Sequence, residues 1–314
     1  MTITGIVITA LILLTVLSFV KQAARPYPGP TEQPEEPETT GVAVMLCHRL
    51  TGEHDHPRMV TKWLPARAKL VDAHWDTVGA LRYVQVPQLS RWNIVFLLVA
   101  LSRSWLVAAI GSMLHGLPSP AGRKHPDELW DLIEVFEFAD STGAAAFLAS
   151  EAAEALAEDG DGWSVHAQAI PMVTTRAYLR THFAPDAAVT LFCLRGRPEI
   201  GRDGMIDYWL DQHRPFVQGL QPVLNYAWYD QHIARGAEDL DAAARDYLPG
   251  HAPWDGMASI GYPHLRDLVY GAVDPRVQLA NLRLVYDETR FIDLPQSALM
   301  LGTVTHIRAD DPVD

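Results

Sequence analysis

The sequence has few cysteines and no excess of basic residues, and both shortages exclude classes of protein. Cys47 and Cys193 are its only cysteines, too few for the dense disulfide framework of a small secreted domain and suited to a reducing compartment. The 25 Lys and Arg residues against 38 Asp and Glu residues give a formal net charge of −13. Nucleic acid binding requires clustered positive charge, so we expect no nucleic acid partner. Because acidic surfaces do not attract anionic lipid, any membrane attachment has to be hydrophobic.

Several catalytic signatures are also missing. The glycine-rich segment GRPEIGRDG, residues 196–204, has the wrong spacing for a phosphate-binding loop. There is no serine elbow, and neither cysteine has a suitable helix-terminal setting. His54 and His56 flank Asp55, but this spacing matches no metal motif, and a polar loop explains it more simply. We therefore expect no metal site.

Charge is absent from the first twenty residues of the chain. Ile3 to Val20 is a run of about 18 apolar or small residues, close to the length that spans a bilayer. A cleaved signal peptide would carry its basic residues before this run, whereas Lys21 and Arg25 follow it. We therefore predict a retained transmembrane anchor over residues 1–24. By the positive-inside rule, these two charges place the globular part in the cytoplasm.

A tether follows the predicted anchor. Residues 25–41 are rich in Pro and Glu and contain almost nothing that could be buried. Such a composition predicts an extended, solvated linker between the anchor and the globular body.

The rest of the chain contains an internal repeat. Trp63 recurs 146 positions later as Trp209, in the segments KWLPAR and YWLDQH. Five further identical pairs have the same spacing: Cys47–Cys193, Arg49–Arg195, Met59–Met205, Leu64–Leu210 and Tyr83–Tyr229. Matched Trp, Tyr and Cys residues in one frame indicate two copies of one unit, with the cysteines as buried free thiols on equivalent strands.

Each copy predicts the element order βαββαβ. A first strand precedes the helix with the tryptophan, a second strand follows, and a third strand opens at a Trp-Asp pair, residues 130–131 and 254–255. A second helix and a closing strand complete the copy. This order is that of the ferredoxin-like unit, an antiparallel sheet with helices on one face. We predict an α+β protein in which tandem units, residues 42–180 and 186–308, press their bare sheet faces together as an intramolecular dimeric α/β barrel.

The helix of the second copy resembles that of the EthD family. Its pattern of Met205, Trp209, His213 and Pro215 on a helix is similar to the family's, as is the closing segment around Phe291 and Asp293. The resemblance implies a dimeric α/β-barrel fold, a group that includes monooxygenases, lactone isomerases, polyketide cyclases and haem-handling enzymes. Oxidoreductase chemistry is favoured by this association alone. Haem is allowed by it, although no single histidine is marked as an axial ligand, and we expect no cofactor.

The first copy carries 22 extra residues between its second and third strands, because the spacing falls to 124 at the Trp-Asp pairs. They coincide with an apolar insertion, residues 92–114. It cannot cross a bilayer, because strands of one sheet would then lie on opposite sides of the membrane. We expect it to lie in the membrane interface or to contact a membrane protein, and a buried helical hairpin remains the alternative. The corresponding loop of the second copy is charged and is expected to be solvated.

His213 is the candidate catalytic residue, since a neutral imidazole can accept a proton at cellular pH. Trp209 lies four positions earlier and should share a helix face that looks down on the sheet. The candidate substrate-binding residues are Trp209, Tyr226, Trp228 and Phe192, with strand alternation placing Tyr229 on the opposite face from Tyr226 and Trp228. A structural role for a tryptophan kept in both copies, and for a single histidine at a helix edge, is the competing interpretation. In the first copy Arg67 replaces the histidine and cannot serve as a base.

Two functions follow from these observations. The first is a membrane-anchored enzyme of the EthD type that acts on a small hydrophobic compound, through oxidoreductase or cyclase chemistry. The second is a non-catalytic subunit that binds a lipophilic ligand or stabilises a membrane-protein complex through residues 1–24 and 92–114.

Overall fold

The computed structural model describes residues 38–50, 56–89, 130–179, 186–248, 254–268 and 274–309. The predicted anchor, the linker up to residue 37 and the apolar insertion 92–114 lie outside this part of the chain. Within it, no helix combines the length and the hydropathy needed to cross a membrane. The linker prediction was too long at its end, because the first strand already begins at Glu38.

Both units have the predicted order of strands and helices. The first contains β1 (Glu38–Leu50), α2 (His56–Arg58), η1 (Met59–Trp63), α3 (Leu64–Ala73), α4 (Trp75–Val78), β2 (Arg82–Pro87), β3 (Leu132–Phe138), α7 (Ser141–Leu148), α8 (Glu151–Asp161) and β4 (Ser164–Leu179). The second contains β5 (Ala188–Leu194), α9 (Gly201–Tyr208), η4 (Trp209–His213), α10 (Arg214–Leu224), β6 (Trp228–Ile233), η5 (Glu238–Leu240), α11 (Asp241–Tyr247), β7 (Gly256–Tyr262), α13 (Pro275–Glu288), η6 (Leu294–Gln296), β8 (Ala298–Thr303) and β9 (His306–Ala309).

The helices that follow the third strand of each unit begin at capping residues. Ser150 Oγ accepts a hydrogen bond from the Ala153 N–H at the start of α8, and Asp274 Oδ1 accepts one from the Arg276 N–H at the start of α13. Such caps satisfy backbone donors that have no partner inside the helix. The first long helix of the second unit ends where Asn225 adopts a left-handed conformation, with φ of 54°.

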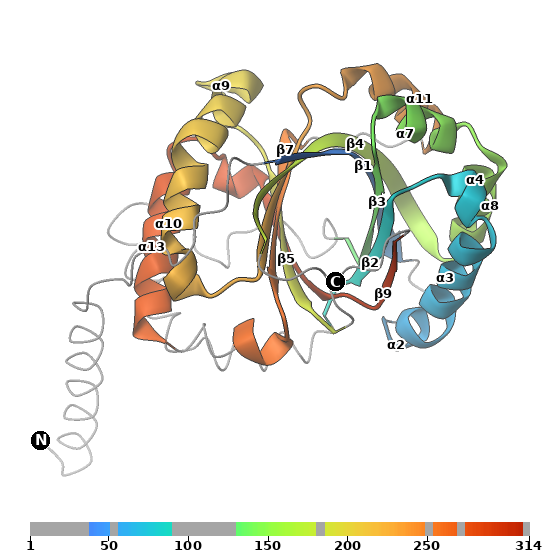
Figure 1. Cartoon of the computed structure of the whole chain (residues 1–314), viewed down its shortest axis with the longest axis horizontal. Helices are drawn as coiled ribbons and strands as arrows, with labels where there is room; N and C mark the ends of the chain where they lie inside the picture. The colour runs from blue at the N-terminus through green and yellow to red at the C-terminus, as the bar shows by residue number, and fades with distance from the viewer. Residues whose placement is uncertain are drawn as a thin grey trace, which may run out of the picture.

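The strands of both units form one antiparallel sheet. Among the described residues its order is β8-β5-β7-β6-β4-β1-β3-β2-β9. Each unit's closing strand pairs first within its own unit and then with the other unit: β4 pairs with β1 and with β6, while β8 pairs with β5 and β9 with β2. The units therefore exchange strands, as the predicted dimeric barrel requires (Figure 1).

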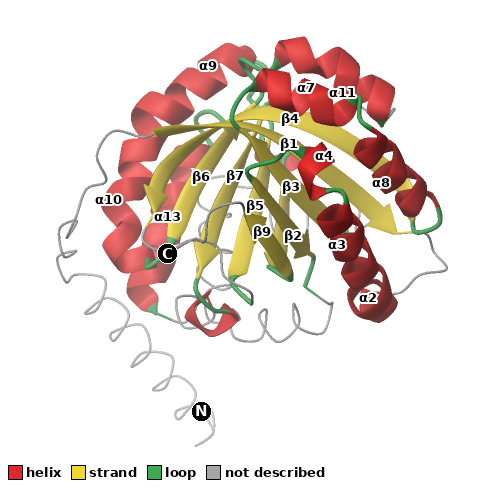
Figure 2. Ribbon diagram, turned by 45° about the vertical axis from the view of Figure 1, so that its right-hand side comes forward, coloured by secondary structure: helices red, strands yellow, loops and turns green. Residues whose placement is uncertain are grey.

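The two ends of the sheet also meet. An antiparallel bridge joins Gln88 to Gly302, and the Leu89 N–H donates to the Leu301 carbonyl at 2.8 Å. The Thr305 N–H donates to the Gln85 carbonyl at 3.1 Å. These bonds close the strands around a common interior, while the helices cover the outside (Figure 2).

Side-chain alternation divides the core into an interior and two helix-covered layers. The barrel interior holds both cysteines, Trp228 and the tryptophans of the two Trp-Asp pairs. One outer layer packs the first unit's strands against α3, α7 and α8, and the other packs the second unit's strands against α9, α10 and α13. Both cysteines are free and buried, as predicted. Burial raises the pKa of the Cys193 thiol to about 12, which suits an inert core residue.

The two Trp-Asp pairs have the same local role in each unit. Asp131 Oδ2 accepts a hydrogen bond from the Leu50 N–H, and Asp255 Oδ2 accepts one from the Gly196 N–H, both at 2.8 Å. Leu50 and Gly196 are themselves 146 positions apart. The aspartate therefore ties the end of each unit's first strand to the start of its third.

The charged loop of the second unit is not simply solvated, contrary to our prediction. It forms η5 and α11, and Leu240 and Ala244 are buried in the outer core of the first unit. Figure 1 shows α11 beside α7. The small apolar residues between the charged residues of this loop form one helix face that packs on the core. The net charge of the loop does not indicate this face.

Candidate functional site

The predicted pocket residues are divided between two faces of the sheet. Trp209 and Tyr226 are fully buried in the helix-covered layer of the second unit, and Phe192 packs against the same layer. Trp228 points instead into the barrel interior. The predicted grouping of Trp228 with Tyr226 was therefore wrong. The reason is that β6 begins only at Trp228, so strand alternation does not extend back to Tyr226, whose ring lies 6.2 Å from that of Tyr229.

His213 is buried and contacts the last α-helix of its unit and the residue that follows this helix closely in sequence, Phe291. Its Nδ1 lies 2.8 Å from Asp287 Oδ2 on α13, and the rings of His213 and Phe291 are 5.0 Å apart. A π-helical turn, η4, runs from Trp209 to His213. Trp209 faces the sheet and donates from Nε1 to the Tyr229 hydroxyl at 3.0 Å. That both side chains share one helix face stays a prediction.

Asp287 is held on both of its oxygens. The Tyr208 hydroxyl donates to Oδ1 at 2.8 Å, and Arg290 donates to the Tyr208 hydroxyl at 3.2 Å. Burial would raise the pKa of Asp287, but the hydrogen bonds from His213 and Tyr208 outweigh it and the pKa lies below its ordinary value. Asp287 is therefore ionised at neutral pH and favours the imidazole tautomer that carries its proton on Nδ1. The Nε2 atom makes no hydrogen bond to any residue of the described ranges and is left as the proton acceptor.

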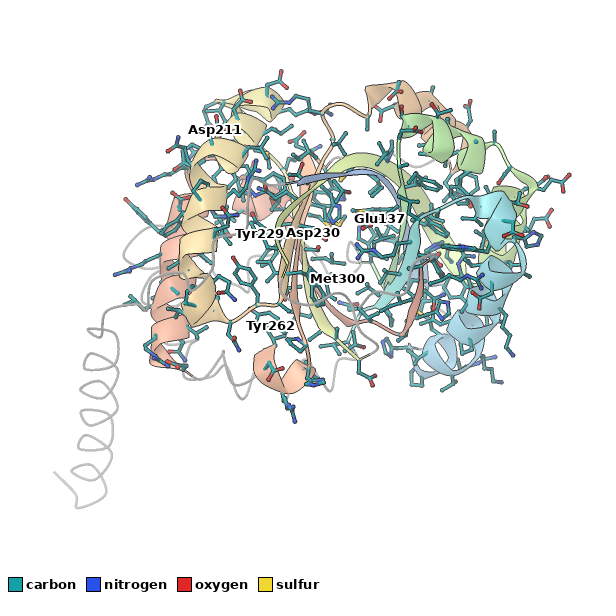
Figure 3. The ribbon with its side chains drawn as sticks, viewed as in Figure 1. Glu137, Asp211, Tyr229, Asp230, Tyr262 and Met300 are labelled. Atoms are coloured by element: carbon teal, nitrogen blue, oxygen red, sulfur yellow. The ribbon has the colours of Figure 1, made fainter. Side chains whose placement is uncertain are left out.

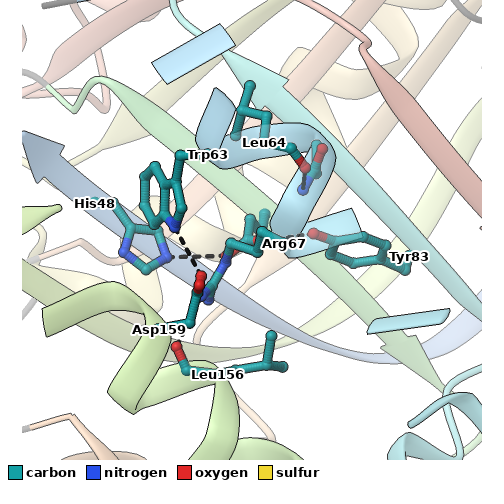
Figure 4. Close-up of polar contacts among 9 residues, drawn as sticks. His48, Trp63, Leu64, Arg67, Tyr83, Leu156 and Asp159 are labelled. Atoms are coloured by element: carbon teal, nitrogen blue, oxygen red, sulfur yellow. Dashed lines mark hydrogen bonds and ion pairs between the residues drawn. The ribbon is translucent and has the colours of Figure 1, made fainter. Parts of the chain in front are cut away.

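The matching place in the first unit holds a closed ion-pair network (Figure 4). Arg67 Nε donates to Glu134 Oε2 at 2.7 Å, and both side chains are completely buried. His48 Nε2 lies 3.0 Å from the same carboxylate oxygen, and the Tyr83 hydroxyl donates to the other. Arg67 also donates to Asp159 Oδ2 at 3.2 Å and lies 5.4 Å from the Trp63 ring.

The charges of this network are fixed by their surroundings. Burial would raise the pKa of Glu134, but the charge of Arg67 and the hydrogen bonds from His48 and Tyr83 lower it to about 2. Burial lowers the pKa of His48 more than Glu134 raises it, so His48 is neutral. Glu134 is therefore charged and His48 neutral, and the network is structural.

Asp159 and Asp287 are equivalent residues that sequence comparison of the first helices alone missed. Each lies on the helix before its unit's closing strand, and each pairs with the residue four positions after the repeated tryptophan. A signal was present, because Asp159 and Trp163 recur 128 positions later as Asp287 and Phe291. The exchange of Arg67 for His213 thus keeps a helix-to-helix hydrogen bond to an aspartate while introducing a titratable group.

The barrel interior contains a second polar group. Arg82 pairs with Glu137 on the neighbouring strand and lies 4.0 Å from Asp230 Oδ2. The strands of Arg82 and Asp230 are four steps apart around the sheet, about 19 Å along its surface, so Arg82 reaches across the interior. Figure 3 shows Glu137, Asp230 and Met300 inside the barrel and Tyr229 on the side of α10.

Neither a metal nor haem is supported by the residues present. In the described ranges no three His, Cys, Asp or Glu side chains are placed to hold a metal ion. Asp287 orients His213 as it would an axial ligand, but Trp209, Tyr226 and Tyr229 fill the layer beside it and a porphyrin would have to displace them. The site does not fit haem.

Comparison with known proteins agrees with this picture of the second unit. Residues 197–295 match the family model described as the EthD domain. This segment is an EthD domain. The match includes Trp209, His213 and Asp287. No curated protein matches the chain.

Solved structures resemble most of the chain at low identity. An anthrone oxidase-like protein has a TM-score of 0.52 and 11% identity, covering 91% of this chain and 98% of its own. A "putative monooxygenase" of Fusobacterium nucleatum has a TM-score of 0.48, 8% identity and coverage of 87% and 96%. A chlorite dismutase variant of Candidatus Nitrospira defluvii has a TM-score of 0.44, 10% identity and coverage of 86% and 92%. At this identity the likeness of the first supports the tandem barrel fold alone.

Proposed function

We propose that this protein is an EthD-type enzyme that removes a proton from a small, largely apolar compound, with His213 as the base. The observation that carries the proposal is the contact of His213 Nδ1 with Asp287 Oδ2 at 2.8 Å. A carboxylate on Nδ1 and a free Nε2 is the arrangement that orients a histidine for proton transfer. Oxidoreductase chemistry is the favoured class, and a cyclase or dehydratase step uses the same base.

Aromatic side chains support the choice of substrate. Trp209, Tyr226, Tyr229 and Phe291 are part of the second unit's helix layer, and Phe192 packs against it. Such walls favour flat apolar molecules. Removal of a proton from an activated carbon or hydroxyl by Nε2 leaves an electron-rich anion, and the Nδ1 contact with Asp287 stabilises the imidazolium that forms.

Anthrone is a suitable first probe because it is flat, apolar and carries an acidic methylene group. The test incubates the purified full chain with anthrone in deuterated buffer and follows both methylene exchange and oxygen uptake. Wild-type protein should accelerate exchange above buffer, and His213→Gln should lose about 10²- to 10⁴-fold of that acceleration.

The matched control is Asp211→Asn, an exposed substitution on the same helix segment. It should leave exchange and the urea unfolding midpoint unchanged. Full exchange activity in a folded His213→Gln protein would exclude His213 as the base.

One observation favours the alternative of a non-catalytic subunit. Arg67 and His213 make equivalent contacts with Asp159 and Asp287, and the contact in the first unit is structural. If His213→Gln loses stability as Arg67→Gln does, while no probe exchanges, the subunit function replaces the enzymatic one. Identification by mass spectrometry of the proteins and ligands that co-purify with the full chain would then name its partner.

We also propose that the chain is held at a membrane by residues 1–24, contacts it or a membrane protein through 92–114, and keeps its globular part in the cytoplasm. The support is the apolar composition of both segments. Carbonate extraction of membranes should leave the full chain in the pellet and release a variant that lacks residues 1–24. Release of both proteins would contradict the anchor.

A further inference from the structure

The carboxylate at the centre of the first unit's network has no counterpart in the second unit. Glu134 on β3 corresponds to Ala258 on β7, as the strand registers show: Glu134 pairs with Gln85, and Ala258 pairs with Gln231. Gln85 and Gln231 are themselves a repeat pair, 146 positions apart. The strand register is therefore the same in both units around this position, which holds an acid in one unit and a methyl group in the other.

In the first unit, this carboxylate is surrounded by donors. Arg67 Nε donates to Oε2 at 2.7 Å, His48 Nε2 lies 3.0 Å from the same oxygen, and the Tyr83 hydroxyl donates to Oε1. Glu134 is completely buried, so the first unit places a carboxylate of its own at this position. Three polar partners on one carboxylate are enough to keep it ionised inside a core.

In the second unit, polar groups remain around the same position without that carboxylate. The Tyr229 hydroxyl, equivalent to that of Tyr83, accepts from Trp209 Nε1, and its own proton has no acceptor among the described residues. Gln231 is fully buried and lies beside this hydroxyl, yet neither atom of its amide makes a hydrogen bond of ordinary geometry. A buried amide with no partner is costly, and such groups mark ligand or water sites.

An unpaired cation is present in the same layer. Arg214 follows His213 and replaces Ala68 of the first unit. Its Nε atom is buried without a hydrogen bond, and Arg214 has no ion-pair partner within the described residues. Burial lowers the pKa of Arg214, while Tyr229 and Asp211 act in the opposite direction. Neither of them forms an ion pair with Arg214 in the described part of the chain.

We propose that the second unit binds a small, mostly apolar molecule that carries one carboxylate, with this group beside Ala258, where the first unit has Glu134. Arg214, Gln231 and the Tyr229 hydroxyl supply the donors, and Trp209 and Phe192 contact the apolar body. The inference rests on the proposed function only in the choice of site, and it specifies the substrate class: an aromatic or alicyclic carboxylic acid.

Calorimetric titration of the full chain with 2-naphthoate tests this, with 2-naphthamide as the neutral probe of the same shape. Naphthoate should bind at least about 10-fold more tightly than the amide, because a hydrogen-bonded charge is worth that factor or more. Arg214→Gln should remove this preference. Arg235→Gln, which removes an exposed arginine paired with Asp207, is the matched control for lost charge and should keep it.

Ala258→Glu provides the complementary variant, since it supplies the carboxylate from within the chain. It should abolish naphthoate binding and leave a folded protein, because the first unit accommodates glutamate in this frame. Should this variant fail to fold, Gln231→Leu is the substitute and should weaken naphthoate binding at least about 3-fold. Equal binding of naphthoate and naphthamide, or equal effects of Arg214→Gln and Arg235→Gln, would overturn the proposal in favour of a water-filled site.

The proposed ligand site and the proposed catalysis can be contradicted independently of each other. His213→Gln should leave naphthoate affinity within about 3-fold of wild type, since His213 is not among the proposed donors. Carboxylate binding without proton exchange on any bound acid would reject the proposed enzyme and keep the ligand site. Exchange on anthrone without a preference for the carboxylate would do the reverse.

Discussion

Arg67 and Glu134 form an ion pair of 2.7 Å in which neither side chain is exposed to solvent. The pair joins α3 to β3 and holds the first unit's helix layer on its sheet. At the same two positions the second unit has His213 and Ala258. The two units therefore share a backbone arrangement but not the buried ion pair.

Removing one partner of this pair should be severe. We expect Glu134→Gln to lower the free energy of unfolding by about 3–5 kcal/mol, because Arg67 would remain buried without its counter-charge. Urea denaturation monitored by tryptophan fluorescence measures the change. The double variant Arg67→Met, Glu134→Leu should lose less than Glu134→Gln, and an equal or larger loss would contradict this account.

Low pH should destabilise the helix layer of the first unit. The folded pKa of Glu134, about 2, lies below its unfolded value of 4.5, so its contribution is complete above that value and is lost as pH falls toward 2. The pKa of His48 is also lowered in the fold, so protonation of the unfolded chain adds to the loss below its usual 6.5. Glu134 accounts for on the order of 3 kcal/mol. Urea midpoints between pH 7 and 3 should fall steadily, and an unchanged midpoint would refute the prediction.

Gly261 should tolerate no side chain. A Cβ atom there would overlap the indole ring of Trp228 on the neighbouring strand. Gly261→Ala should cost about 1–3 kcal/mol through overpacking, measured as a lower melting temperature. Gly219→Ala is the control, since nothing lies within 4 Å of its added methyl group, and on α10 it should gain about 0.5–1 kcal/mol. Equal effects of the two substitutions on the melting temperature would show that the barrel interior adjusts to the added methyl group.

Asp287 should act through His213 if the proposed chemistry is correct. Asp287→Asn keeps a hydrogen bond to Nδ1 but no longer fixes the tautomer with Nε2 unprotonated. Proton exchange on the probe should fall about 10²-fold or more, with the fold retained. The matched variant in the first unit, Asp159→Asn, should leave exchange unchanged, and a comparable loss there would mean that both effects arise from stability.

The sequence predicted the fold well because its strongest signals report packing. Trp63 and Trp209 are both about 1% exposed, and the repeated Trp-Asp pairs bind equivalent backbone groups. Large side chains held in one frame had to occupy the same places in each unit. The order of elements, the buried free cysteines and the second unit's likeness to the EthD domain were all confirmed.

The site was less predictable because it depends on contacts between segments far apart in the sequence and on where a strand begins. His213 contacts Asp287 on α13, and no periodicity marks such a partner. Tyr226 precedes its strand, so alternation misplaced it. Asp287, Arg214 and Gln231 became candidates only when partners, or the lack of them, could be seen.

The exchange of closing strands has a mechanical consequence. Since β4 completes the sheet of the second unit and β9 that of the first, neither half can melt while the other survives intact. Differential scanning calorimetry should therefore record one endotherm for both repeats, and a protease nick between them should leave the halves associated until denaturant is added. Because the two units fold as one, one copy can change in sequence while the other copy keeps it folded.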